Sequence, residues 1–335
     1  MEGRIDSTGM CSAIGGAMVR LLGLAFDAFE EAMRGVSGRY VPLKRNTDEW
    51  GMQYIVLADI EVMLGHNGGG SIYEGACQPE NFGLFFPLSR TGDVILNGQP
   101  MGQRTIAWLV PDRHFHCYNS DVLRWVGISV GCGTVRHWLN DLAEDFRPGP
   151  GEHLVGQSMP SLVAGLGDLV CRIFRVSDVA PEALEDMSAR RTLYEQLVSG
   201  IYDAVQAVEP LPSTAHGRPR LARKEIIRRA LDLLDMEMSE TLLVTDLSQA
   251  AGVSSRTLQT AFLEHFGLTP HRFLMLRRLR AIHEALQSAG QTETVAQICG
   301  RFGVWDFGRF SRSYKHIYGE LPSKVLSRGR PAVPA

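Results

Sequence analysis

The sequence lacks any uninterrupted apolar run of the roughly 18 residues that a membrane-spanning helix requires. The segment nearest to such a run, Ser12 to Phe29, is interrupted by Arg20 and Asp27. A secretory signal would need a basic start, an unbroken apolar core and a small-residue cleavage site, and this segment fits that pattern poorly. These absences favour a cytoplasmic protein without a membrane partner. Within the segment we expect an amphipathic helix from Leu21 to Met33, after a disordered extension that ends before Ser12.

Cysteine is scarce, and none of the six cysteines has the C-x-x-C or other paired spacing of a metal or disulfide site. They are scattered along the chain at Cys11, Cys77, Cys117, Cys132, Cys171 and Cys299. Such scatter favours reduced thiols over a disulfide framework or a zinc site. We therefore expect neither a metal nor another cofactor.

Net charge is also small, at −3, but it is unevenly distributed. Residues 218 to 330 hold 18 Lys and Arg against 11 Asp and Glu, whereas the rest of the chain holds 16 against 26. A basic segment joined to an acidic one is typical of a polyanion-binding module attached to a second domain. Charge alone leaves open a solvated basic face that has no partner.

What the sequence does contain is an internal repeat between Val244 and Pro322. The two copies match at offsets of 51 before a central turn and 52 after it. The matching pairs are Leu247 with Ile298, Gly252 with Gly303, Leu258 with Phe310, Phe262 with Tyr314, Gly267 with Gly319 and Pro270 with Pro322. A repeat of this kind defines the architecture before any propensity argument is needed.

Each copy has the pattern of a helix-turn-helix. A short apolar helix ends at a glycine able to take positive φ. A capping residue follows, Ser254 or Ser255 in one copy and Asp306 in the other, and then a second helix with apolar positions at i, i+4 and i+8. One such pattern could be an ordinary αα-corner, but two matched copies favour DNA binding. We expect the contacts to double-stranded DNA to come from Ser254, Arg256, Thr257, Gln259, Thr260, Phe307, Gly308, Ser311, Arg312 and Lys315.

The segment between the copies, Pro270 to Gln287, is predicted to form one helix of about 18 residues, about 27 Å long. A rod of that length could hold two recognition helices near the roughly 34 Å that separates successive major grooves. Arg277 and Arg280 lie on this connecting helix, and we expect them to contact phosphates rather than bases.

The closing segment F-G-R-F-S-R-S-Y-K-H-I-Y-G-E-L-P-S is similar to the signature of the AraC/XylS family of bacterial transcription regulators. The resemblance covers residues 223 to 328. It departs from the family pattern at Trp305, where a small polar residue is usual. The resemblance implies a DNA-binding domain with two helix-turn-helix units, preceded by a jelly-roll-like sensory domain and a helical pair.

Between residues 40 and 130 the apolar period changes to two, which predicts short strands separated by turns. The expected strands are 54–57, 60–64, 82–86, 93–96, 106–110, 114–118 and 124–130, followed by helices at 135–146, 162–174 and 183–208. Many short strands at this spacing suggest a β-sandwich or small barrel. Together with the jelly-roll that the family resemblance implies, the expected fold class is α+β, with a jelly-roll or cupin-like β domain, a helical dimerisation segment and an all-α domain that holds two helix-turn-helix units. The expected division is 1–39 (extension and helix), 40–208 (sensing and dimerisation), 209–222 (linker) and 223–328 (DNA binding).

Three patterns in the β domain point to other classes of protein. Gly127 to Gly131 matches the nucleophile elbow G-x-S-x-G, but no α/β alternation precedes it to position an acid and a histidine. The H-x-H of His114 and His116 resembles a cupin metal pair, although it comes late and lacks the following Glu. Gly68 to Gly70 lacks the lysine of a phosphate-binding loop and is expected to be a mobile turn. We assign no catalytic residue, and keep a cupin-like or hydrolase-type enzyme as the alternative.

The predicted function is sequence-specific transcription regulation controlled by a small-molecule effector in the β domain, with RNA polymerase as a further partner. The effector pocket is expected to be lined by Trp108, His114, His116, Tyr118 and Trp125, although the same residues could simply be core. An apolar stripe on 183–208 predicts a homodimer, unless that face packs on its own β domain.

Overall fold

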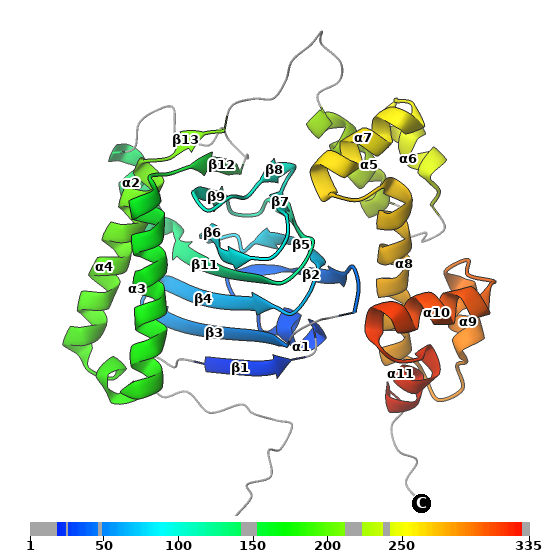
Figure 1. Cartoon of the computed structure of the whole chain (residues 1–335), viewed down its shortest axis with the longest axis horizontal. Helices are drawn as coiled ribbons and strands as arrows, with labels where there is room; N and C mark the ends of the chain where they lie inside the picture. The colour runs from blue at the N-terminus through cyan, green and yellow to red at the C-terminus, as the bar shows by residue number, and fades with distance from the viewer. Residues whose placement is uncertain are drawn as a thin grey trace, which may run out of the picture.

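The computed structural model describes residues 19–24, 26–45, 49–141, 153–211, 223–236 and 242–329. These form a β-rich N-terminal domain and a helical C-terminal domain (Figure 1). The predicted α+β class is confirmed, with two antiparallel sheets in the first domain and two helix-turn-helix units in the second. Among the described residues, no helix combines the length and apolarity needed to cross a bilayer.

The larger sheet has the strand order β1-β3-β4-β11-β6-β9-β12-β13. Its strands are β1 Val19–Leu24, β3 Trp50–Leu57, β4 Ile60–Asn67, β11 Leu123–Gly131, β6 Asn81–Arg90, β9 Thr105–Leu109, β12 Leu154–Gln157 and β13 Glu209–Pro210. The smaller sheet has the order β2-β5-β10-β7-β8. Its strands are β2 Val36–Pro42, β5 Ser71–Cys77, β10 His114–Asn119, β7 Val94–Leu96 and β8 Gln99–Pro100. The helical elements of this domain are α1 Phe26–Glu31, α2 Cys132–Asp141, α3 Pro160–Val179, the 3-10 helix η2 Pro181–Leu184 and α4 Met187–Gln206.

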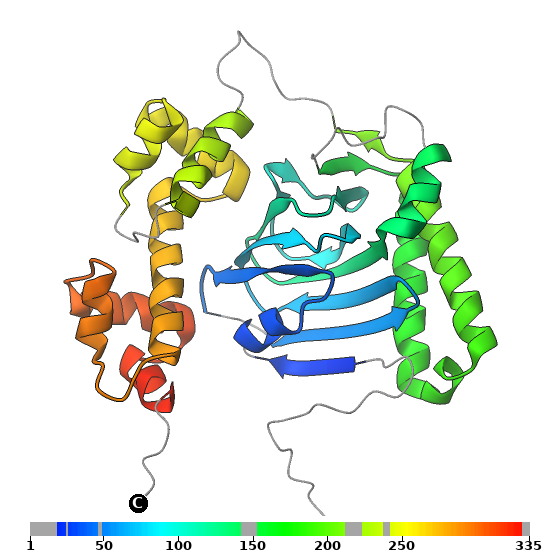
Figure 2. The same ribbon diagram turned by 180° about the vertical axis from the view of Figure 1, so that it is seen from behind.

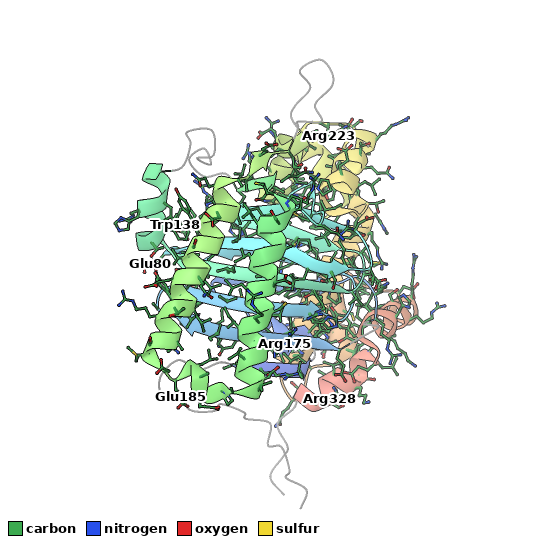
Figure 3. The ribbon with its side chains drawn as sticks, turned by 60° about the vertical axis from the view of Figure 1, so that its left-hand side comes forward. Glu80, Trp138, Arg175, Glu185, Arg223 and Arg328 are labelled. Carbon is green, nitrogen blue, oxygen red and sulfur yellow. The ribbon has the colours of Figure 1, made fainter. Side chains whose placement is uncertain are left out.

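Alternation along the central strand β11 explains the layers of this domain. Because successive side chains of a strand point to opposite faces, Val126 and Ile128 pack with the apolar side chains of α3 and α4 in one core cluster. Trp125 belongs instead to the cluster between the two sheets. Figure 3 shows α3 and α4 lying across the larger sheet. The smaller sheet and α1 lie on the side of the domain that faces α8 (Figures 1 and 2).

The C-terminal domain is built around one long helix, α8, which has the predicted bounds Pro270–Gln287. Its other helices are α5 Arg223–Met236, α6 Val244–Ala251, α7 Ser255–Phe266, α9 Val295–Arg301, α10 Phe307–Tyr318 and α11 Pro322–Gly329. The fully buried side chains of Leu247, Phe262 and Ile298 come from both repeats and share one core cluster. The predicted linker is described only as far as residue 211, and the rest of it lies outside the described residues.

The expected helix from Leu21 to Met33 is wrong. Residues Val19–Leu24 form β1, which pairs antiparallel with β3, and only Phe26–Glu31 is helical. Gly23 has φ of +67°, and the register of β1 shifts between Leu22 and Leu24. Pairing with a strand distant in sequence therefore overrides the local helical pattern. The expected boundary at residue 40 also falls inside a strand, since β2 runs from Val36 to Pro42. Residues 1–18 of the expected extension lie outside the described residues.

Gly68 to Gly70 is packed rather than an exposed mobile turn, because all three glycines are buried. A Cβ atom on Gly70 would come within 2.5 Å of the Ser120 carbonyl oxygen. The Gly69 carbonyl accepts a hydrogen bond from Asn119 Nδ2 at 3.0 Å. The glycines here permit close approach of two backbone segments, and the strand β5 that follows them was not predicted.

The apolar stripe of 183–208 packs on its own domain. Leu197, Ile201 and Val205 of α4 are fully buried in the cluster that fills the space between the helices and the larger sheet. Met187, the first residue of α4, is 81% exposed. Of the two alternatives for this stripe, the structure supports packing on its own domain, because the sheet of the same chain already covers Ile201.

We predict that Ile201→Ala lowers the free energy of unfolding by about 2–5 kcal/mol, because it leaves a cavity between α4 and the sheet. Urea titration of the full chain measures this change. Met187→Ala, on the same helix but exposed, should change stability by no more than about 0.5 kcal/mol. A stable Ile201→Ala variant that loses only self-association would contradict this packing.

Candidate nucleic-acid interface and buried cavity

The first helix-turn-helix is formed by α6 and α7. Gly252 ends α6 with φ of +66°, in the left-handed region predicted for it. Ser254 caps α7, since its Oγ accepts a hydrogen bond from the Thr257 backbone N–H at 3.2 Å. Leu258 and Phe262 are fully buried and fix α7 against the rest of the domain.

The second unit, α9 and α10, repeats this geometry. Gly303 follows α9 with φ of +67°. Asp306 caps α10 by accepting a hydrogen bond from the Arg309 backbone N–H at 2.9 Å. Phe310 and Tyr314 are buried at the positions that correspond to Leu258 and Phe262. Both capping residues agree with the expectation from sequence.

The residues predicted to contact DNA lie on the outer surfaces of these two units. Nine of the ten are exposed and Ser311 is half-buried; the exposed ones are Ser254, Arg256, Thr257, Gln259, Thr260, Phe307, Gly308, Arg312 and Lys315. Arg256 and Lys315 supply positive charge on α7 and α10. A Cβ atom on Gly308 would meet nothing closer than 3.7 Å, so this point of α10 leaves room for a close approach from outside.

Trp305 was not predicted to be a site residue; the sequence marked it only as a departure from the family pattern. Trp305 lies directly before the α10 cap and is 76% exposed, while Phe307, at the start of α10, is 39% exposed. Two exposed aromatic rings therefore flank Asp306 at the N-terminal end of the second recognition helix.

The connecting helix α8 carries an ionic cluster that joins the two domains. Arg280 is only 5% exposed, and its guanidinium pairs with Asp27 and, at 3.0 Å, with Glu30, both from α1 of the N-terminal domain. Its third partner is Glu284, one turn further along α8, at 2.6 Å. The expectation that Arg280 contacts phosphates is wrong for this conformation, because its charge is buried and neutralised. Arg277 likewise lies 3.9 Å from Glu74 of β5.

An aromatic group extends this cluster to the second recognition helix. His283 of α8 lies 3.1 Å from the Asp27 carboxylate, and its ring stacks on Tyr318 of α10 with centroids 4.1 Å apart. Burial alone would raise the pKa of Asp27, but the hydrogen bond and charge of His283, together with Arg280, lower it below its usual value. For Glu30 burial outweighs Arg280, and the pKa is raised.

The outer face of the smaller sheet also takes part in the domain contact. Ile72 of β5 joins the core cluster of the helical domain. His116 of β10 lies edge-on to Phe266 at 5.1 Å, and Tyr118 fills the space beside Gly267, where a Cβ atom would come within 2.5 Å of its ring. Burial lowers the pKa of His265, which faces His116, to about 3, so its ring is neutral at physiological pH.

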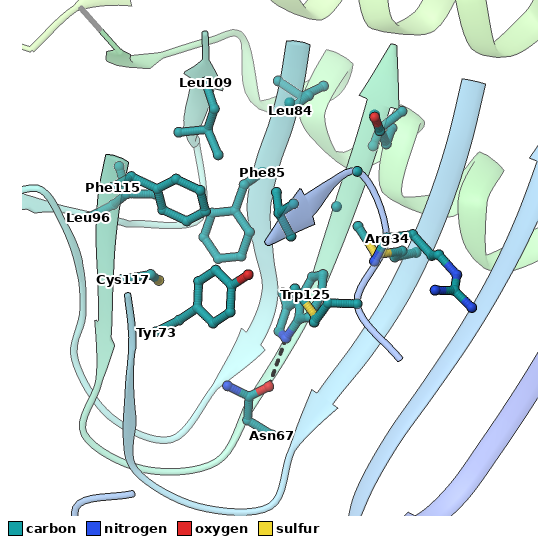
Figure 4. Close-up of a pocket in the computed structure, with 18 of the residues that line it drawn as sticks. Arg34, Asn67, Tyr73, Leu84, Phe85, Leu96, Leu109, Phe115, Cys117 and Trp125 are labelled. Carbon is teal, nitrogen blue, oxygen red and sulfur yellow. Dashed lines mark hydrogen bonds between the residues drawn. The ribbon is translucent and has the colours of Figure 1, made fainter. Parts of the chain in front are cut away.

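The inner face of the smaller sheet, together with the larger sheet, encloses a cavity of about 50 Å³ (Figure 4). Its walls are mainly apolar, and include Leu96, Leu109, Phe85, Phe115 and Trp125. Asn67 and Asn119 also line it, and both have hydrogen-bond partners: Asn67 Oδ1 accepts from Trp125 Nε1 at 2.9 Å, and Asn119 Nδ2 donates to the Gly69 carbonyl.

Of the five residues predicted to bind an effector, only Trp125 lines this cavity. Trp108 is buried on the other face of the larger sheet, where it stacks on Phe82 at 5.4 Å. His114 is exposed, and His116 and Tyr118 face the helical domain. Alternation along β10 is the signal that could have found the lining, since it turns Phe115 and Cys117 inward.

The sequence patterns that suggested an enzyme do not have the surroundings that a nucleophile elbow or a metal site requires. Ser129 lies inside strand β11 between two neighbouring strands, whereas a nucleophile elbow needs a turn from strand to helix. Across the described part of the chain, no group of three or more His, Cys, Asp or Glu side chains is arranged to hold a metal ion. The described cysteines are Cys77, Cys117, Cys132, Cys171 and Cys299, and each is a free thiol.

Comparison with known proteins finds matches to the helical domain. A family model described as a helix-turn-helix domain matches residues 247–328. The chain is 32% identical over 175 residues to the probable thc operon regulatory protein of Rhodococcus erythropolis, a match that covers 52% of this chain and 49% of the relative. It is 25% identical over 125 residues to XylDLEGF operon transcriptional activator 2 of Pseudomonas putida, covering 37% of this chain and 80% of that protein. The chain thus spans about half the length of the Rhodococcus relative.

Among solved structures, a probable AraC family transcriptional regulator from Rhodopseudomonas palustris is 28% identical. The match covers 32% of this chain and 98% of that one, with a TM-score of 0.30.

We predict that Arg280→Gln lowers the free energy of unfolding by about 3–5 kcal/mol, because it leaves the two half-buried carboxylates of Asp27 and Glu30 without their buried counter-charge. Adding Asp27→Asn and Glu30→Gln should recover part of the loss, since of the three carboxylates around Arg280 only that of Glu284, which is the most exposed, then remains charged. Both changes are measured by urea titration. Arg191→Gln, which removes an exposed ion pair with Glu195, is the control and should cost less than about 1 kcal/mol. Equal effects of Arg280→Gln and Arg191→Gln would show that the cluster does not join the domains.

Proposed function

Because the C-terminal domain of this chain belongs to the AraC/XylS family of transcription regulators, we propose that the chain regulates transcription by reading two adjacent major grooves. In this proposal α7 enters one groove and α10 the next. A small molecule bound in the N-terminal domain controls the affinity for DNA. Relatives that are transcription regulators argue against an enzyme.

The observation that carries the proposal is the geometry of α8. Its 18 residues make a rod about 27 Å long, with one helix-turn-helix at each end (Figure 1). Successive major grooves on one side of B-DNA lie about 34 Å apart. Because each recognition helix keeps its apolar side in a shared core and its polar side outward, both polar sides are free to meet base edges.

The outward residues divide by the chemistry they offer. Arg312 and Arg256 can donate two hydrogen bonds to a guanine, and Gln259 can pair with an adenine in the same two-bond manner. Phe307 can pack on a thymine methyl group. The hydroxyls of Ser254, Thr257, Thr260 and Ser311 and the ammonium of Lys315 suit phosphate oxygens or base edges, and Gly308 allows the DNA backbone to approach α10.

Control by an effector is supported by the position of strand β5. Tyr73 of β5 lines the cavity, while its neighbours Ile72 and Glu74 contact the helical domain on the opposite face. A molecule that changes the position of β5 would therefore alter the contact with α8. The two events would be linked through a single layer of strands, and by linkage DNA would in turn change the affinity for the effector.

Further partners belong to the same proposal. A homodimer is supported by exposed apolar side chains near the α3–α4 turn, where Val179 is 80% and Met187 is 81% exposed. A further proposed partner is RNA polymerase, because activation of transcription requires a contact with it. A regulator of this kind works in the cytoplasm. Sedimentation of the purified chain measures its oligomeric state.

We predict that Arg312→Ala weakens binding to the preferred operator by about 1–3 kcal/mol and relaxes the preference at one base position only. Gln259→Ala should relax one position in the other half-site, about one helical turn away. Footprinting against randomised half-sites measures both effects.

Arg175→Ala is the matched control for Arg312→Ala. It removes an exposed charge from α3 of the other domain (Figure 3) and should leave DNA affinity unchanged. Unchanged affinity and preference in both Arg312→Ala and Gln259→Ala would show that at least one helix does not read DNA.

A further inference from the structure

The turns of the two helix-turn-helix units differ by one residue. In the first unit a single residue, Val253, separates the turn glycine from the cap of the recognition helix. In the second unit two residues, Val304 and Trp305, separate them. The backbone N–H groups of Val253 and Val304 occupy equivalent positions, since each donates to the carbonyl five residues earlier at 3.0 Å. Trp305 is therefore the inserted residue, and the first unit has no counterpart of it.

The side chain of Trp305 is held between the two helices of its unit. A Cβ atom on Gly300 of α9 would lie 3.7 Å from the indole ring, so the ring lies over the end of α9. On its other side, Asp306 begins α10. In a DNA-bound helix-turn-helix the first helix crosses the sugar–phosphate backbone, and the N-terminal residues of the second helix contact base edges. The ring therefore lies at the edge of the groove that α10 would enter.

The surroundings of the ring match the surface of DNA. Trp305 is 76% exposed, and a large apolar ring gains free energy when it is removed from water. Phe307 is exposed beside it, and Arg309, Arg312 and Lys315 are exposed further along α10. Cationic side chains suit phosphates, while the apolar group that the major groove offers is the C5-methyl of thymine. Apolar rings bordered by positive charges thus fit a thymine-containing major groove.

We propose that Trp305 is a specificity-determining residue whose indole packs on the C5-methyl group of a thymine in the half-site read by α10. This inference rests on the proposed function, since it requires that α10 enter a major groove. Because the first unit lacks the inserted residue, the contact is confined to the α10 half-site. The two half-sites should therefore differ in their need for a thymine methyl group at this position.

Replacing thymine by deoxyuridine tests the contact, because the replacement removes only the methyl group. The probe is a duplex selected by the full chain from a randomised pool, with its α10 half-site identified by the position that Arg312→Ala relaxes. One deoxyuridine in that half-site should weaken binding by the parent chain about fourfold, the effect of one buried CH₂-sized group. Trp305→Ala should bind the unmodified duplex about tenfold more weakly and lose its sensitivity to that deoxyuridine.

Two further variants control for the loss of an apolar side chain. Trp305→Phe keeps an apolar ring and should retain part of the sensitivity to deoxyuridine. Leu22→Ala removes a side chain that is 61% exposed on β1 of the other domain, and should bind every duplex as the parent chain does. Because Trp305 is exposed, Trp305→Ala should keep the urea midpoint of the parent chain.

Fluorescence gives an independent measurement of the same contact. The chain has five tryptophans, and the four besides Trp305 are at most 8% exposed: Trp50, Trp108, Trp125 and Trp138. Quenching by acrylamide should therefore act mainly on Trp305. The selected duplex should protect this fluorescence from acrylamide, because the ring is covered in the complex.

Three results would each overturn the proposal: unchanged DNA affinity in Trp305→Ala, equal deoxyuridine effects in the parent chain and Trp305→Ala, or full access of acrylamide to Trp305 in the complex. A selected duplex without thymine in the α10 half-site would also overturn it. These failures differ from failure of the proposed function. A full chain that selects no sequence from the pool contradicts DNA reading itself, whereas a selected duplex that Trp305→Ala binds normally contradicts only the role of Trp305.

Discussion

The ionic contact between Arg280 and the two α1 carboxylates is the interaction on which the arrangement of the domains depends. The charges of Asp27 and Glu30 are largely removed from water, and a buried charge is tolerated only when it is paired with good geometry. Arg280 also belongs to the helix that joins the two DNA-reading units, so the contact fixes that helix against the N-terminal domain. The stacking of His283 on Tyr318 extends this restraint to α10.

The two faces of the smaller sheet make different contacts. Its inner face lines the cavity through Tyr73, Phe115 and Cys117, and its outer face contacts α7 and α8 through Ile72 and His116. A strand turns successive side chains to opposite faces, so ligand and helical domain can be separated by a single layer of backbone. Because packed interiors are dense and transmit strain, this sheet is the shortest physical route between the proposed effector and the recognition helices.

In each recognition helix, only the residues on the inward-facing side pack in the core. Leu258 and Phe310 are buried and hold each helix in its unit, whereas Arg256 and Arg312 are exposed and carry no packing role in the described structure. Stability and specificity are thus assigned to different positions of the same helix. This separation lets the outward residues vary with the DNA sequence while the fold is retained.

The sequence by itself determined the features that depend on near neighbours in the chain. These are the seven strands expected from the period of two, the bounds of α8 and the capping of both recognition helices. A glycine of positive φ and a side chain that bonds a nearby N–H both act within a few residues. Only the tertiary structure decided that Val19–Leu24 is a strand, that Arg280 meets Asp27 some 250 residues away, and that Tyr73 rather than His116 faces the cavity. Those outcomes depend on pairing, burial and register between distant segments, which local periodicity does not contain. A shift of one residue along β10 exchanges its inner and outer faces, and for this reason the composition of the strand predicted a pocket but not the side chains that line it.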